Sequence, residues 1–222
     1  MLNWPAIPIH LHDIDYMIAS RLRRSAHSRN LGSLLFRGAY PIQVHGSHHV
    51  PLHEPLIVIV DSIDPVGQLL IKSVSPRPLI AFTQIIDTEF TGDIPFQEPF
   101  GVSAQLDALA VLHQGGAILL NMDRIEPGFL VNQSKAAVIP ASLWVEHRGD
   151  AGFSPWGLRP ATPRSRVRLY FDQVSPPIVS EVSAPASGGL VTIDRFVSER
   201  CRQILQDHKD MVRQRLGERT AR

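Results

Sequence analysis

Apolar runs and segments of helical periodicity alternate along the chain. The runs are rich in β-forming apolar residues, as in strands buried on both faces of a sheet, and lie at 56–60, 78–83, 117–120 and 136–145. Between them, residues 66–74 and 103–112 repeat apolar positions at helical spacing, with Ser103 as the expected N-cap of the second helix. This order predicts an α/β fold with a mostly parallel, mixed sheet flanked by helices.

Both ends of the chain are also predicted to be helical. Apolar residues recur at helical spacing before residue 39, and the turn formers Asn30 and Gly32 predict two short helices there. A broad apolar stripe begins near Ile193, after a stretch whose composition is typical of a flexible linker. We therefore expect four parts: an N-terminal helical segment at 1–39, an α/β domain at 40–180, a linker at 181–191 and a C-terminal helix at 192–222.

The charge and cysteine content exclude several classes of function. With 22 basic and 21 acidic residues, the chain has no global field that would hold nucleic acid. Cys201 is the single cysteine, which excludes an internal disulfide, and its helical surroundings favour a structural thiol over a nucleophile. The start of the chain does not match a signal peptide, and no run is long and apolar enough for a membrane span. We expect a cytoplasmic protein, and peripheral attachment to the inner face of the membrane is left open.

The predicted N-terminal helices are rich in arginine. Five arginines are interspersed with the apolar residues, namely Arg21, Arg23, Arg24, Arg29 and Arg37. A basic helix face of this kind attracts anionic lipid headgroups by about 1 kcal/mol per well-placed cation. The alternative is an ordinary helix face in contact with solvent. An anionic membrane surface is therefore one expected partner.

Several segments occur in the order and spacing of a known family. They are VHGSHHVP (44–51), LIVIVDSIDPVGQLL (56–70), LDALAVLHQGGAILL (106–120), KAAVIPASLWV (135–145) and WGLRPATPRSRVRLYF (156–171). Together they resemble the lysophospholipid acyltransferase family of the 1-acylglycerol-3-phosphate acyltransferase type, and in particular the acyltransferase part of bacterial 2-acylglycerophosphoethanolamine acyltransferases. The resemblance implies a glycerolipid acyltransferase-like fold without a cofactor. It also implies a phospholipid or acyl chain as ligand, with acyl-CoA or acyl carrier protein as acyl donor.

The motif that supplies the family's general base is incomplete in this chain. The family places a histidine five residues before an aspartate in N-H-x4-D, and Asp64 matches that aspartate. Ile59 stands at the histidine position, so no imidazole is available there to accept a proton. If an insertion shifts the alignment, Asp61 becomes the nearest polar residue, although a carboxylate of ordinary pKa is a weak base. The resemblance thus makes Asp64 and Asp61 the candidate catalytic residues.

The other family motifs are also altered. Gln97 stands where the family has a phosphate-binding arginine, and it lacks both the charge and the bidentate fork of that side chain. The F-P-E-G motif corresponds to residues 121–124, where Asp123 keeps a carboxylate and Arg124 replaces the glycine. Pro140 retains the late proline, which a strand tolerates at an edge or where no ladder bond is needed. By resemblance, Gln97, Asp123, Arg124 and Pro140 are the predicted substrate-binding residues.

A histidine-rich segment offers a substitute base. Four histidines precede the first buried strand, and His49 stands five residues before Glu54, so His49 or His48 is the candidate for a relocated base. Imidazole nitrogens with Glu54 would also suit zinc, and a solvated polar loop is the simplest alternative. We favour the loop and predict no metal site.

Three functions remain open at this stage. The loss of three motifs favours an acyltransferase-like protein that is catalytically degenerate and binds a lipid, an acyl chain or a partner. An active but divergent lysophospholipid O-acyltransferase is the second possibility. The third is an α/β protein that is unrelated to lipids.

Overall fold

The fold is that of a computed structural model, which describes residues 11–61, 63–83, 91–95, 101–146, 153–155, 165–175 and 189–220. Within these ranges eight strands form one sheet, in the order β1-β8-β6-β2-β5-β3-β4, with β7 paired to β6. The strands are β1 (Ile42–His45), β2 (Leu56–Val60), β3 (Ile80–Thr83), β4 (Ile94–Pro95), β5 (Ala117–Asn121), β6 (Ala137–Glu146), β7 (Phe153–Pro155) and β8 (Arg166–Phe171).

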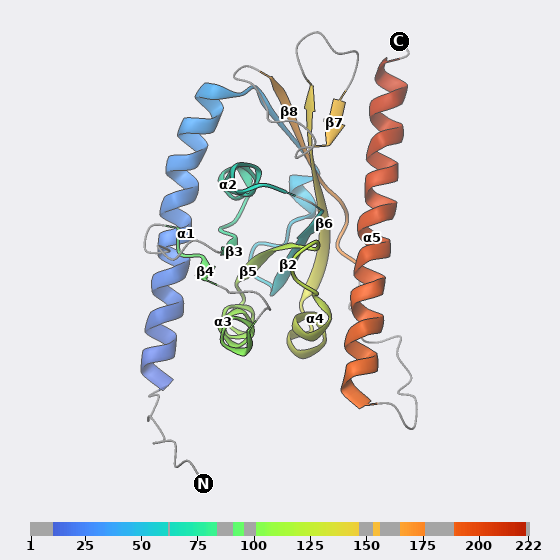
Figure 1. Cartoon of the computed structure of the whole chain (residues 1–222). Helices are drawn as coiled ribbons and strands as arrows, with labels where there is room; N and C mark the ends of the chain where they lie inside the picture. The colour runs from blue at the N-terminus through green and yellow to red at the C-terminus, as the bar shows by residue number, and fades with distance from the viewer. Residues whose placement is uncertain are drawn as a thin grey trace.

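Helices cover the sheet on both sides, with α1 and α5 at opposite flanks of the molecule (Figure 1). The helices are α1 (Leu11–Ala39), the short 3-10 helix η1 (Ser47–His49), α2 (Pro65–Val74), α3 (Val102–His113), α4 (Gly128–Ser134) and α5 (Gly189–Thr220). Strand β2 runs parallel to β5 and β6, and β3 runs parallel to β4 and β5. Strands β7 and β8 are antiparallel to β6. The predicted fold class, a mostly parallel mixed sheet flanked by helices, is confirmed.

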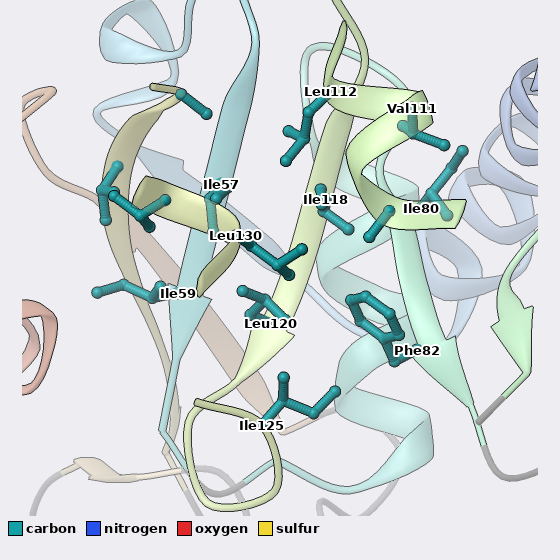
Figure 2. Packing of buried hydrophobic residues seen from close by; sticks show 14 of the residues in the cluster. Ile57, Ile59, Ile80, Phe82, Val111, Leu112, Ile118, Leu120, Ile125 and Leu130 are labelled. Atoms are coloured by element: carbon teal, nitrogen blue, oxygen red, sulfur yellow. The ribbon is translucent and has the colours of Figure 1, made fainter. Parts of the chain in front are cut away.

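Strand β2 lies at the centre of the core and is at most 2% exposed along its whole length. Its alternate side chains belong to two apolar clusters on opposite faces of the sheet. Leu56, Val58 and Val60 pack in the cluster that includes α2, whereas Ile57 and Ile59 pack in the cluster that includes α3, α4 and α5. Figure 2 shows Ile57 and Ile59 within the second cluster. A strand enclosed in this way needs an apolar side chain at every position.

The N-terminal segment forms the single helix α1, so the prediction of two short helices was wrong. Gly32 lies inside the helix, and a Cβ atom built there would lie 2.1 Å from the Oγ of Ser73 on α2. The glycine therefore permits a close approach of two helices and does not end one. Two arginines of the predicted basic face bond protein groups instead of facing solvent. Arg21 donates to the Asp93 carbonyl at 2.6 Å and pairs with Asp107. Arg29 donates to the Pro76 carbonyl at 3.2 Å.

Two further local expectations need correction. The N-cap position of α3 is Gly101 and not Ser103, and no side-chain hydrogen bond caps this helix. The second concerns helix α4, since no helix was predicted over residues 128–134. It begins at Gly128, where a Cβ atom would lie 1.9 Å from the Asp194 carbonyl oxygen of α5, so contact with α5 accompanies this short helix. None of the helices in the described part of the chain is both long and apolar enough to cross a membrane.

Arg77 holds together the amino ends of β2 and β5. The guanidinium is buried, and it donates to the carbonyl oxygens of Pro51 at 2.8 Å, Glu54 at 2.7 Å and Gly115. Pro51 and Glu54 lie just before β2, and Gly115 lies just before β5. One side chain thus satisfies three carbonyl groups and fixes where both strands start.

We predict that Arg77→Met lowers the free energy of unfolding by about 3 kcal/mol or more, because three carbonyls lose a charged donor. Urea unfolding followed by circular dichroism measures this change. Arg200→Met, at an exposed position on α5, is the matched control and should change stability by less than about 0.5 kcal/mol. Equal effects of the two substitutions would contradict the assigned role of Arg77.

Candidate functional site

The candidate site lies where β2 and β5 end at the same edge of the sheet. In parallel sheets, ligands bind beyond the carboxyl ends of the strands, because the loops there are free to vary. Asp61 and Asp64 follow β2, and Asp123 and Arg124 follow β5, with Val60 directly paired to Asn121. The fold therefore brings together four of the residues predicted from sequence.

The position at which we looked for a catalytic histidine, Ile59, is buried in the core. Ile59 is 0% exposed and points into the apolar cluster on the α5 side of the sheet (Figure 2). Asp64 is the N-cap of α2, and its Oδ1 accepts a hydrogen bond from the Gly67 amide at 2.7 Å. A capping role of this kind stabilises a helix by about 1 kcal/mol and explains the aspartate without catalysis.

Asp61 and Asp123 line the same cavity, which has a volume of about 170 Å³. Helix α5 supplies the opposite wall, and the lining residues are Asp61, Met122, Asp123, Arg202, Leu205, Gln206 and Lys209. Lys209 forms an ion pair with Asp61, and Arg202 pairs with Glu126 at 2.7 Å. The cavity thus presents two carboxylates and two cations, and it is smaller than the 300 to 1,000 Å³ of a typical ligand pocket.

Arg124 lines a second cavity, on the α2 side of the strand ends. This cavity has a volume of only about 30 Å³, which suffices for about one water molecule. Asn121 also borders it and donates from Nδ2 to the Ile63 carbonyl at 3.2 Å. Arg124 is therefore close to Asp123 in sequence, but the two side chains line different cavities.

The predicted phosphate-binding segment is described only up to Pro95, so Gln97 lies outside the described residues. Within the described part of this segment, Asp93 is buried in an ion pair with Lys72 of α2. Its carboxylate also accepts a hydrogen bond from the Ala81 amide at 2.8 Å. Burial lowers the pKa of Lys72, an effect that Asp93 opposes. This pair joins α2 to the sheet edge at β3 and β4.

Pro140 is buried within β6, where it pairs with Ile59 of β2. Its carbonyl accepts from the Asp172 amide at 3.2 Å. Since the N–H and C=O of one strand residue point to the same side, the missing N–H faces the end of β8 and not β2. The proline therefore removes no hydrogen bond between β2 and β6, as expected. It lines neither of the two cavities described above.

The histidine-rich segment lies apart from both cavities. His48 and His49 belong to η1, and their rings meet edge to face with centroids 4.0 Å apart. Neither residue lines the cavity next to Asp61 or the cavity next to Arg124. Among the residues that the structure describes, no group of three or more His, Cys, Asp or Glu side chains could hold a metal ion. The roles of His48 and His49 stay predictions.

A polar network that the sequence did not indicate is centred on His208, the residue before Lys209 on α5. His208 of α5 is 1% exposed, and its Nε2 lies 2.9 Å from the Oγ of Ser142 on β6. Its Nδ1 lies 3.2 Å from Oδ2 of Asp172, which follows β8. Ser142 also accepts a hydrogen bond from Nε1 of Trp144 at 3.0 Å. Three elements thus contribute to one chain of hydrogen bonds.

The partners of His208 define its tautomer. The Asp172 carboxylate accepts, so Nδ1 carries the proton and Nε2 is the acceptor for the Ser142 hydroxyl. Burial lowers the pKa of His208, and nearby Arg215 lowers it further, whereas Asp172 raises it. The imidazole is therefore neutral at neutral pH. The network could not be predicted from the sequence, because Ser142 and His208 are 66 residues apart and the serine is not part of a recognised motif.

Cys201 is a structural residue, as the sequence indicated. The side chain is 0% exposed within the cluster on the α5 side of the sheet. Burial raises the pKa of its thiol to about 12, although Arg202 opposes this shift. The thiol is therefore protonated at neutral pH and is not available as a nucleophile.

Comparison with known proteins gives a likeness to solved structures. No protein-family model matches the sequence, and no curated protein matches it significantly. Among solved structures, the crystal structure of the 1-acyl-sn-glycerophosphate (LPA) acyltransferase PlsC from Thermotoga maritima aligns with 91% of this chain and 84% of its own. The two chains share 14% identical residues with a TM-score of 0.49. The fold class given above follows from the strands and helices themselves.

We predict that His208 makes the protein less stable in acid. The pKa of His208 is lower in the folded than in the unfolded chain, so the unfolded chain binds more protons as pH falls below about 6.5. The stabilisation is present above this pH and is lost as pH falls through the folded pKa, by up to about 1.4 kcal/mol per pH unit.

Urea unfolding at a series of pH values from about 7.5 to 5 tests this linkage. His208→Gln should show a shallower decline than the wild type, because glutamine does not titrate. The exposed His53→Gln provides the control and should keep the wild-type slope. Parallel pH profiles for wild type and His208→Gln would refute the prediction.

Proposed function

We propose that this protein is acyltransferase-like in fold and binds a lysophospholipid through its headgroup, without the histidine chemistry of that family. The observation that carries the proposal is that Ile59 is buried and that Asp64 caps a helix, at the two positions of the family's H-x4-D motif. Ile59 is fully buried in β2 and offers no base, and Asp64 is engaged as the N-cap of α2. The order and spacing of the family-like segments support a lipid ligand, as does the cavity at the ends of β2 and β5.

The charges of the cavity support a zwitterionic headgroup. Lys209 and Arg202 would exchange their ion pairs with Asp61 and Glu126 for a phosphate, and Asp123, together with the released Asp61, would bind an ammonium group. The volume of about 170 Å³ suits a small polar group better than a long alkyl chain. A phosphoethanolamine headgroup carries both charges at a short separation. We therefore propose lysophosphatidylethanolamine as the first ligand to test.

Mass spectrometry of the purified protein, after incubation with mixed lysophospholipids and acyl-CoA or acyl carrier protein, tests the proposal. We expect retained lysophosphatidylethanolamine and no acylated phospholipid. Asp123→Asn should weaken binding of lysophosphatidylethanolamine by about tenfold or more but spare lysophosphatidic acid, which has no ammonium group. Lys209→Met should weaken both lipids, because both contain a phosphate.

Arg195→Met is the matched control, because Arg195 is an exposed cation of α5 that does not line the cavity and pairs with Glu199 one helical turn away. It should bind both lipids as the wild type does. Acylated phospholipid formed by the pure protein would instead support an active, divergent acyltransferase. The absence of any retained lipid would support an α/β protein unrelated to lipids.

We further propose that α1 attaches the protein to an anionic membrane. Its exposed surface carries large apolar side chains, with Leu34 75% and Leu35 71% exposed, and also the exposed cation Arg23. Apolar and basic side chains together favour binding at a lipid interface. Because Arg21 and Arg29 bond protein groups, the leucines contribute more to this surface than the sequence suggested.

We predict that Leu34→Glu reduces binding to vesicles of phosphatidylglycerol and phosphatidylcholine by about tenfold or more, through lost apolar contact and added repulsion. Vesicle sedimentation at low and high salt measures this. Val102→Glu adds the same charge at a 70% exposed apolar position of α3 and should leave binding nearly unchanged. Equal losses for both variants would show that charge alone, and not α1, determines binding.

A further inference from the structure

We propose that Ser142, His208 and Asp172 form a second functional site, in which Ser142 is the nucleophile of an acyl-ester or acyl-thioester hydrolase. This activity goes beyond the proposed lipid binding and does not depend on it. It requires only that an activated acyl group reach the serine. The proposal rests on the geometry of the three groups.

The hydrogen bonds run in the direction that nucleophilic catalysis requires. Trp144 donates to the Ser142 oxygen at 3.0 Å and so directs the hydroxyl proton toward Nε2 of His208, 2.9 Å away. Asp172 accepts from Nδ1 at 3.2 Å and holds the imidazole in the tautomer that can take a proton. A nucleophile, a base and a residue that orients the base are thereby placed in series.

The triad is related to the cavity of about 170 Å³ through neighbouring residues, because none of its three members lines that cavity. Ala141 pairs with Val60, so Ser142 of β6 and Asp61, which directly follows β2, come next along two paired strands. Asp61 lines the cavity, and so does Lys209, which directly follows His208 on α5. Ser142 itself is partly exposed, in contrast to its buried neighbours Ala141 and Leu143.

The proposed reaction has two balanced steps. Ser142 Oγ attacks the carbonyl carbon while its proton passes to His208 Nε2, and Lys209, the residue that follows His208 on α5, is the cation we assign to stabilise the oxyanion. The bond to the alcohol or thiol breaks, and His208 returns the proton to that leaving group. Water then attacks the acyl-serine with His208 as the base, releasing the carboxylic acid and restoring the Ser142 hydroxyl.

Labelling of the full chain with a fluorophosphonate, followed by tryptic digestion and mass spectrometry, tests the proposal. We expect one adduct, on the peptide that contains Ser142, together with hydrolysis of p-nitrophenyl acetate. Ser142→Ala and His208→Gln should abolish the adduct and lower turnover by about a hundredfold or more. Asp172 acts as a positioning residue, so Asp172→Asn should lower kcat with little change in KM.

Ser198→Ala is the matched control, because Ser198 is a buried serine of α5 that accepts from the Gly128 amide at 3.0 Å. It should retain both the adduct and turnover. A folded wild-type protein without an adduct at Ser142 would overturn the proposal. So would an adduct that persists in folded His208→Gln. If that variant does not fold, Asp172→Asn, at a partly exposed position, decides the same question through kcat.

Discussion

The burial of β2 on both faces is the constraint on which the rest of this structure depends. Every residue of the strand is at most 2% exposed, so a polar side chain inside it would lose its contact with water without gaining a partner. Ile59 satisfies that constraint. The first polar residue after the strand is Asp61, so the charged groups that follow β2 lie beyond its carboxyl end.

Helix α5 supplies the polar groups that the sheet lacks. Its buried stripe includes Cys201, Leu205 and Val212, and His208 occupies a place in the same stripe. A buried imidazole is costly unless both ring nitrogens have partners, and Ser142 and Asp172 provide them. The next residue, Lys209, reaches Asp61 at the end of β2. One helix thus connects a neutral hydrogen-bond network with a charged cavity.

The two proposed lipid-contacting regions lie on opposite flanks of the sheet, since α1 and α5 flank it from different sides (Figure 1). A ligand that reaches the cavity near α5 from a membrane at α1 must leave the bilayer. A single-chain lysophospholipid does this more readily than a phospholipid with two chains, because less apolar surface is transferred into water. The arrangement therefore suits a ligand that exchanges between membrane and solution.

The sequence by itself determined the central strands, the fold class and the absence of a histidine at position 59, whereas the short strands β4 and β7 were not predicted. Continuous apolar runs such as 56–60 predict buried strands from local composition alone, and the identity of Ile59 needs no structure. Tertiary structure decided what depends on distant neighbours. Gly32 was predicted to break the helix because the local sequence does not show that it contacts Ser73. The role of His208 was not predicted, because its partners Ser142 and Asp172 are brought to it only by the packing of β6, β8 and α5. Hydrogen bonds between residues far apart in sequence leave no periodic signal, so only the folded chain reveals them.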